Sequence, residues 1–234
     1  MFTTRPFSDQ AAYICGLMAT DGCISHLHPN TYEVRVALQR RDRAILMQIK
    51  SLLGYGGPLR TRRRKHEGRQ DQAVLSINSP PLALALMALG ISVRKTATLK
   101  VDDELARMPA FWAGAWDGDG TIGWTKGGWV QTGLVTASPR FARQCFSFCK
   151  SILPETKARV YVRPGRGNRR TLYRVQFASR KAARLLAAIY SNGSPALAIK
   201  RKLAQARKAM RVHGLAARER KAATARLVVE QSPL

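Results

Sequence analysis

Acidic residues are scarce in this sequence of 234 residues: 14 Asp and Glu stand against 40 Lys and Arg, which leaves a formal net charge of +26. Such an excess is not typical of an enzyme that acts on small metabolites, and it indicates a polyanionic partner. Long apolar runs are missing as well. The longest, residues 82–91 (LALALMALGI), is too short to cross the about 30 Å of a bilayer's hydrocarbon core, and it predicts a buried helix.

Cysteine is also sparse, since four cysteines in a chain of this length do not make a disulfide scaffold. Cys145 and Cys149 lie four residues apart in an amphipathic stretch, which predicts reduced thiols in the core. One further group matches no familiar zinc spacing: Cys15, Cys23, His26 and His28. The first residues lack a basic start followed by an apolar segment, so we expect an intracellular, soluble protein with no membrane partner.

Hydrophobic periodicity divides the chain into two halves with the same order of elements: helix, two strands, helix, two strands, helix. The first half has predicted helices at residues 9–19, 42–53 and from 79, and strands at 32–41, 58–64 and 73–78. The second has helices ending at 119 and spanning 139–153 and 180–190, with strands up to 137, at 158–163 and at 171–178. The predicted fold class is mixed α+β, with half-domains 1–104 and 105–210 and a basic C-terminal helix or tail, 211–234.

Two helices that stop at Asp-Gly carry the most informative pattern. Residues 14–22 read ICGLMATDG, and residues 112–120 read WAGAWDGDG. Gly16 and Thr20 in the first motif, and Gly114 and Gly118 in the second, recur every four positions and so share one helix face. Glycine inside a helix costs about 1 kcal/mol relative to alanine, so this face predicts close contact between the two helices.

Asp21 and Asp119 end the two motifs, where the negative ends of the helix dipoles disfavour a carboxylate. Side-by-side packing of the helices would bring the two carboxylates together. Unless one pKa rises, such a pair calls for a cation, and carboxylate and carbonyl oxygens are the ligands that Mg²⁺ prefers. The alternative is that each Asp-Gly serves only as a helix stop and turn.

Over residues 7–210 the sequence resembles the LAGLIDADG homing endonucleases in their single-chain form with two motifs. The second motif is the closer match, and the first departs from the family pattern at Ala19 and Thr20 but keeps its last aspartate. The resemblance implies a monomer whose pseudo-symmetric halves pack through the motif helices. Each half would present an antiparallel, saddle-shaped sheet to double-stranded DNA.

The resemblance also implies the catalytic machinery. Asp21 and Asp119, with the backbone oxygens of Thr20 and Gly118, would hold Mg²⁺ or another divalent cation such as Mn²⁺ against the scissile phosphates. Basic residues near the metal correspond to Lys95 and Lys202. Gln39, near the end of a predicted strand, resembles a residue that positions water.

Arginine and glutamine dominate the polar faces of the predicted strands, and these side chains can read guanine and adenine edges in the major groove. A polar strand face is otherwise simply the solvated side of a sheet. The predicted DNA-binding residues are Arg35, Gln39, Arg41, Arg60, Arg62, Arg64, Arg159, Tyr161, Arg163, Arg174 and Gln176.

The sequence therefore predicts a metal-dependent, site-specific endonuclease that cuts both strands of double-stranded DNA. Two alternatives on the same scaffold stay open. One is a maturase that binds intron RNA and needs no intact metal site. The other is a DNA-binding protein without activity, in which loss of function would show first in the motif that carries Ala19.

Overall fold

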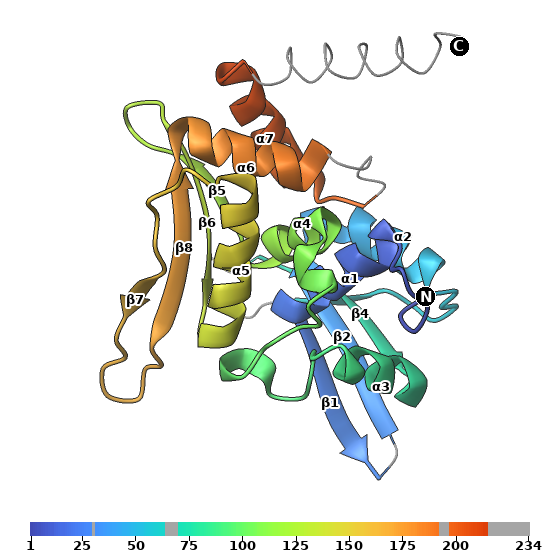
Figure 1. The fold of residues 1–234 in the computed structure, drawn as a ribbon. Helices are drawn as coiled ribbons and strands as arrows, with labels where there is room; N and C mark the ends of the chain where they lie inside the picture. The colour runs from blue at the N-terminus through green and yellow to red at the C-terminus, as the bar shows by residue number, and fades with distance from the viewer. Residues whose placement is uncertain (30, 64–69, 192–196, 215–234) are drawn as a thin grey trace, which may run out of the picture.

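The structure is a computed structural model that describes residues 1–29, 31–63, 70–191 and 197–214 (Figure 1). The first half contains α1 (Asp9–Thr20), β1 (Gly22–His28), β2 (Thr31–Gln39), α2 (Arg43–Leu52), β3 (Arg60–Arg62), β4 (Gln72–Asn78) and α3 (Pro80–Ala88). The second contains α4 (Pro109–Gly118), β5 (Thr121–Trp124), β6 (Val130–Thr136), α5 (Pro139–Ile152), β7 (Tyr161–Arg163), β8 (Leu172–Ala178) and α6 (Ser179–Ser191), followed by α7 (Lys200–Val212).

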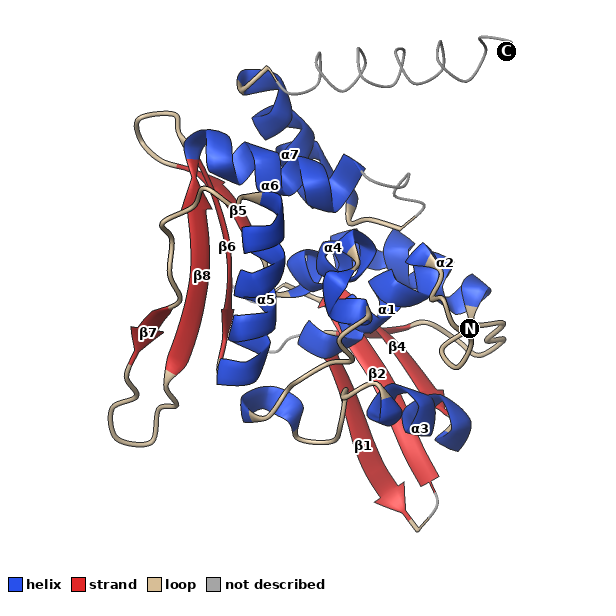
Figure 2. Cartoon of the chain, in the orientation of Figure 1, coloured by secondary structure: helices blue, strands red, loops and turns tan. Residues whose placement is uncertain are grey.

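The predicted α+β class and the repeated order of elements are confirmed. Each half forms a four-stranded antiparallel sheet, ordered β1-β2-β4-β3 in the first and β5-β6-β8-β7 in the second. The registers correspond as well: β1 pairs Cys23, two residues after Asp21, with Arg35, and β5 pairs Thr121, two residues after Asp119, with Gly133. Figure 2 shows the two sheets flanking a helical centre that contains α1 and α4.

Local sequence signals explain where the helices begin. The side chains of Ser8, Ser79 and Ser138 accept hydrogen bonds from the first turns of α1, α3 and α5. Proline at the first position of α3 and α5 adds a fixed φ that suits a helix start. One core runs through both halves, with the motif helices and the inner faces of both sheets buried in it.

Several predicted boundaries differ from the structure. The strand expected at 32–41 ends at Gln39, because the chain turns into a 3₁₀ helix, Arg40–Asp42, so Arg41 leaves the strand face. The strand expected at 158–163 begins only at Tyr161, which leaves Arg159 before it. The apolar run 82–91 is a buried helix only in part: α3 ends at Ala88, and Leu84 on its outer face is 55% exposed, whereas Ala83 and Leu86 are buried.

Two elements were not located from the sequence. Strand β1 follows Asp21 directly, where no strand had been placed. Helix α7 begins eleven residues before the predicted C-terminal helix and has no equal among the described residues of the first half, where a 3₁₀ turn, Lys95–Ala97, stands near the corresponding place. The described residues hold no helix long and apolar enough to cross a membrane. Of the predicted tail, residues 215–234 lie outside the described residues.

Candidate functional site

The two motif helices meet at backbone contact. A Cβ atom on Gly16 would lie 1.9 Å from the backbone oxygen of Phe111 in α4, and one on Gly114 would lie 2.0 Å from that of Tyr13 in α1. Any side chain larger than hydrogen would force α1 and α4 apart. The other two predicted interface residues meet at the end of the seam, where a Cβ on Gly118 would lie 2.0 Å from the hydroxyl oxygen of Thr20.

This packing brings Asp21 and Asp119 together as the C-terminal caps of α1 and α4. Their backbone N–H groups donate to the carbonyls of Leu17 (2.9 Å) and Ala115 (3.1 Å), which fixes both residues at helix ends. The carboxyl carbon of Asp21 lies 3.5 Å from the position of a Cβ on Gly118, so the Asp21 carboxyl sits against the last turn of α4.

The electrostatics of the pair reflect this crowding. Burial raises the pKa of Asp21 to about 6, and the nearby charge of Asp119 adds to the rise. Burial raises the pKa of Asp119 too, although this side chain stays open to solvent on one side. The charges of Lys202 and Lys95 act in the opposite direction on both aspartates. A bound cation would therefore stabilise the ionised form of both carboxyl groups.

The donor set fits a hard divalent cation, because it offers two converging carboxylates that destabilise each other when ionised. Asp21 and Asp119 would bind the ion directly. The described part of the chain, this site included, forms no group of three or more His, Cys, Asp and Glu side chains that could hold a metal ion. In particular, Cys15 is buried in α1 while Cys23 is exposed on β1, so those two thiols do not converge.

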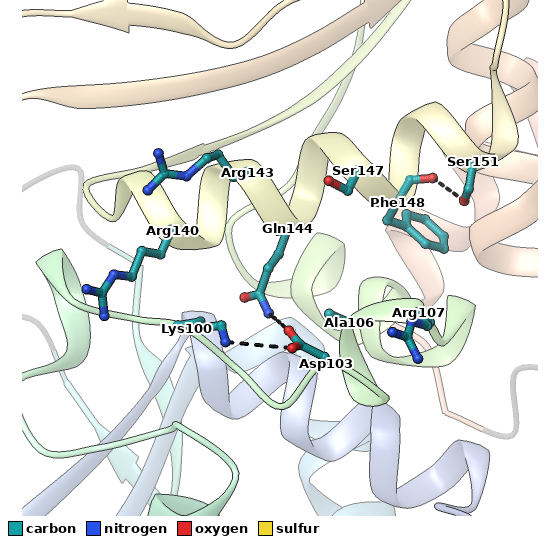
Figure 3. A pocket seen from close by; sticks show the side chains of 10 residues that line it. All are labelled: Lys100, Asp103, Ala106, Arg107, Arg140, Arg143, Gln144, Ser147, Phe148 and Ser151. Atoms are coloured by element: carbon teal, nitrogen blue, oxygen red, sulfur yellow. Dashed lines mark hydrogen bonds and ion pairs between the residues drawn. The ribbon is translucent and has the colours of Figure 1, made fainter.

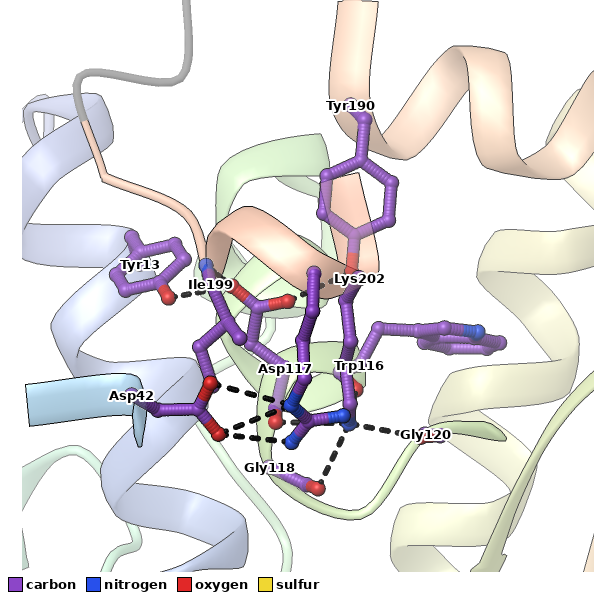
Figure 4. A network of polar contacts seen from close by, with 10 residues as sticks. Tyr13, Asp42, Trp116, Asp117, Gly118, Gly120, Tyr190, Ile199 and Lys202 are labelled. Carbon is purple, nitrogen blue, oxygen red and sulfur yellow. Dashed lines mark hydrogen bonds and ion pairs between the residues drawn. The ribbon is translucent and has the colours of Figure 1, made fainter. Parts of the chain in front are cut away.

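Both predicted lysines reach the ends of the motif helices, but in different ways. The ammonium of Lys95 donates to the backbone oxygen of Gly22. Lys202 lies in the first turn of α7 and is 8% exposed. Its ammonium contacts four backbone oxygens at the end of α4: those of Trp116 (2.6 Å), Asp117 (2.8 Å), Gly118 (3.0 Å) and Gly120 (2.8 Å) (Figure 4).

One of the two predicted backbone ligands, the oxygen of Gly118, already has a hydrogen-bond donor. This oxygen accepts a hydrogen bond from Lys202, which leaves one lone pair for a metal ion.

Gln39, the predicted water-positioning residue, ends β2, and its buried amide oxygen has no hydrogen-bond partner among the described residues. A water molecule could satisfy this oxygen.

In the first half, four of the predicted DNA-binding residues share one face of the sheet. Arg35 and Gln39 alternate with buried residues along β2, and the register of β3 and β4 places Arg60 and Arg62 on the same face. Arg35 also forms an ion pair of 3.6 Å with Glu33. Arg41 lies off this face, and Arg64 lies outside the described residues.

The second half repeats this face with different side chains. Tyr161 and Arg163 on β7 lie beside Arg174 and Gln176 on β8, and all four line one hollow of about 820 Å³. Arg159 precedes β7, with its guanidinium 5.8 Å from the ring centre of Tyr161. The sheet face therefore offers cationic, amide and aromatic groups together.

A second hollow, of about 790 Å³, lies between α5 and the connector before α4 (Figure 3). Arg140 and Arg143 line it from α5, and Lys100 and Arg107 from the connector. Lys100 pairs there with Asp103 at 3.7 Å. Because α5 packs on the core side of the second sheet, this hollow is separated from the sheet face that carries Arg174 and does not belong to the site.

Sequence reasoning missed three charged residues near the site: Asp42, Asp117 and Arg201. Asp117 is 1% exposed and accepts hydrogen bonds from Tyr13 and Tyr190. Arg201 of α7 forms a bidentate ion pair with the buried carboxylate of Asp42 in the first half: its Nε donates to Oδ1 (3.1 Å) and its terminal NH2 group to Oδ2 (2.9 Å). For Asp117 the sequence offered a signal, because the second motif has this aspartate at the place where the first motif has Ala19.

A prediction for stability follows from the raised pKa of Asp21. In the folded state this carboxyl binds its proton more tightly than in the unfolded chain, so without divalent metal the free energy of unfolding should fall as pH rises from about 4 to about 6. Asp21→Asn should remove about 1 to 3 kcal/mol of this pH dependence. Chemical denaturation in EDTA at several pH values measures it. A wild-type protein that gains stability over this range relative to the variant would contradict the assignment.

The fold and the site define a class of protein: two similar α+β halves joined by glycine-lined helices that end in paired aspartates. The profile of the LAGLIDADG-like domain matches residues 8–96 and 108–189, and the chain belongs to this family. No curated protein sequence matches the chain.

Three solved structures are similar in fold. I-DmoI, in complex with DNA and Ca, is 14% identical with a TM-score of 0.56, over 84% of this chain and 95% of that one. The meganuclease I-CpaMI, bound to uncleaved DNA, is 10% identical with a TM-score of 0.53, over 91% and 93%. The homing endonuclease I-SmaMI, bound to cleaved DNA, is 10% identical with a TM-score of 0.51, over 92% and 91%.

Proposed function

We propose that this chain is a monomeric, site-specific endonuclease that hydrolyses both strands of double-stranded DNA with a divalent cation. The observation that carries the proposal is the meeting of Asp21 and Asp119 at the end of the α1 and α4 seam, between two sheets with basic faces. The similar I-DmoI structure holds both DNA and Ca, which supports the same two partners here. Residues 1–104 and 105–210 would each cover one half of the target.

The site residues divide the work. Asp21 and Asp119 would hold Mg²⁺ or Mn²⁺, and the bound ion supplies an attacking water of lowered pKa and a stabilising charge for the leaving oxygen. Lys95 and Lys202 add positive charge where the phosphate becomes more negative. The arginine and glutamine side chains of the two sheet faces would contact phosphates and base edges.

Cleavage of a library tests the proposal. The purified chain is incubated with supercoiled plasmids that carry candidate target sites, with Mg²⁺ and separately with EDTA. We expect linear DNA of defined ends in Mg²⁺ only. Specific binding without cleavage would favour a non-catalytic DNA-binding protein, and rescue of intron splicing without cleavage would favour an RNA maturase. Either outcome would overturn the endonuclease.

The basic sheet faces predict a strong dependence of DNA affinity on salt. If they neutralise about eight phosphates, the logarithm of the affinity should fall with the logarithm of the salt concentration at a slope of about −7. Fluorescence anisotropy of a labelled duplex in Ca²⁺, at salt concentrations of about 50 to 300 mM, measures this slope. A slope near zero would contradict binding through these faces.

A further inference from the structure

Asp117 lies at the junction of three elements and takes no part in the chemistry proposed above. Its carboxylate accepts hydrogen bonds from the Tyr13 hydroxyl of α1 (2.6 Å), the Tyr190 hydroxyl of α6 (2.8 Å) and the backbone N–H of Ile199 (2.6 Å) (Figure 4). Burying a carboxylate is costly unless it is hydrogen-bonded, so these three donors define its place closely. Ile199 is the N-cap of α7, and Asp117 thereby fixes where that helix begins.

The start of α7 determines the position of Lys202, three residues further on. An ammonium has three N–H donors, and four backbone oxygens at the end of α4 surround this one within 3.0 Å. The pair between Arg201 and Asp42 holds the same turn of α7 against the first half. In this arrangement no N–H group of Lys202 is left for a phosphate.

The described residues of the first half form no such arrangement. Ala19 stands in place of Asp117, and a short 3₁₀ turn, Lys95–Ala97, stands in place of α7. Lys95 donates to Gly22, whose place in the first motif corresponds to that of Gly120 in the second. Among the described residues this is its one hydrogen-bond acceptor, so two N–H groups of Lys95 stay available.

We propose that Asp117 is a positioning residue that makes the two cleavage centres unequal. Through the start of α7 it turns every N–H of Lys202 onto the backbone at the end of α4. Lys202 then acts on Asp119 through charge and position alone, whereas Lys95 can contact a phosphate directly. The proposal rests on the proposed endonuclease function for its effect on cleavage, but not for the arrangement of Lys202 itself.

Lysine acetylation read by mass spectrometry tests the arrangement without DNA. The exposed neighbour Lys200, in the same turn of α7, is the internal control. Because hydrogen-bonded buried groups react only through local opening, Lys202 should label at least about tenfold more slowly than Lys200. Burial lowers the pKa of Lys202 to about 8, which by itself would speed its labelling, so slow labelling reports its contacts. Equal rates in the wild-type chain would overturn the proposal.

Two variants of Asp117 separate positioning from folding. Asp117→Ala should bring the labelling of Lys202 to within about threefold of that of Lys200, while Asp117→Asn, which keeps one acceptor oxygen, should restore most of the protection. Tyr190→Phe, which removes a single donor, serves if the alanine variant does not fold, and should raise Lys202 labelling alone. Unchanged protection of Lys202 in folded Asp117→Ala, or in Tyr190→Phe if the alanine variant does not fold, would overturn the proposal.

Cleavage of each strand gives the functional readout. On the DNA that the wild-type chain cuts, Asp117→Ala should slow the cleavage of one strand at least about tenfold more than that of the other, so that nicked circles accumulate. In Asp117→Asn this difference between the strands should largely disappear. Equal slowing of both strands would show a merely structural role and overturn the proposal. A wild-type chain that cuts nothing would defeat the endonuclease function, and the labelling result would still decide the arrangement of Lys202.

Discussion

Replacing Asp119 by asparagine should abolish double-strand cleavage, with a loss of about three orders of magnitude or more in rate, because an amide oxygen is a much poorer ligand for a hard cation. DNA affinity should change by less than about threefold, since the basic sheet faces are untouched. Plasmid cleavage in Mg²⁺ and duplex binding in Ca²⁺ measure the two effects separately.

The matched control for this prediction is Asp103→Asn. It removes the same charge from an exposed carboxylate, 64% accessible, in the connector before α4. The control should cut at close to the wild-type rate. Full activity in Asp119→Asn, or an equal loss in Asp103→Asn, would remove Asp119 from the proposed metal site.

Gly114→Ala should strongly destabilise the folded chain. The added Cβ would lie 2.0 Å from the backbone oxygen of Tyr13, and α1 and α4 cannot separate without opening the core between the halves. Overpacking at a backbone contact costs about 3 kcal/mol or more, which corresponds to a fall in Tm of about 10 °C for a chain of this size. Thermal unfolding followed by circular dichroism measures it.

Gly56→Ala is the control, because a Cβ at Gly56 meets no atom of the described residues within 4 Å. It should change Tm by no more than about 2 °C, since surface substitutions usually stay within about 0.5 kcal/mol. A Gly114→Ala variant as stable as Gly56→Ala would show that the helices do not pack at backbone contact.

The motif helices were predictable because their pattern has a physical cause. Glycine at Gly16 and Gly114 is unfavourable in a lone helix, so its recurrence on one face already indicates a close neighbour. Asp-Gly at each helix end then places the carboxylates. Strand faces were predictable from alternation, but their ends were not, because Arg41 continues the alternation of β2 after the backbone has turned into a 3₁₀ helix.

The polar network around Asp117 was not predictable from local sequence. Its partners Tyr13, Tyr190 and Ile199 come from three separate elements, and no spacing along the chain relates them. Helix α7 was missed for a related reason. Its many Lys and Arg residues suggest a solvated segment, whereas Lys202 and Ala206 are buried by tertiary contacts.

Diffraction from crystals of the chain with its duplex and Mn²⁺, recorded at a wavelength where manganese scatters anomalously, tests the central claim most directly. We expect anomalous density within about 2.0 to 2.5 Å of carboxylate oxygens from both Asp21 and Asp119, between the end of the helix seam and the DNA backbone. Manganese bound away from these two side chains, or carboxylates that do not converge on the DNA, would contradict it.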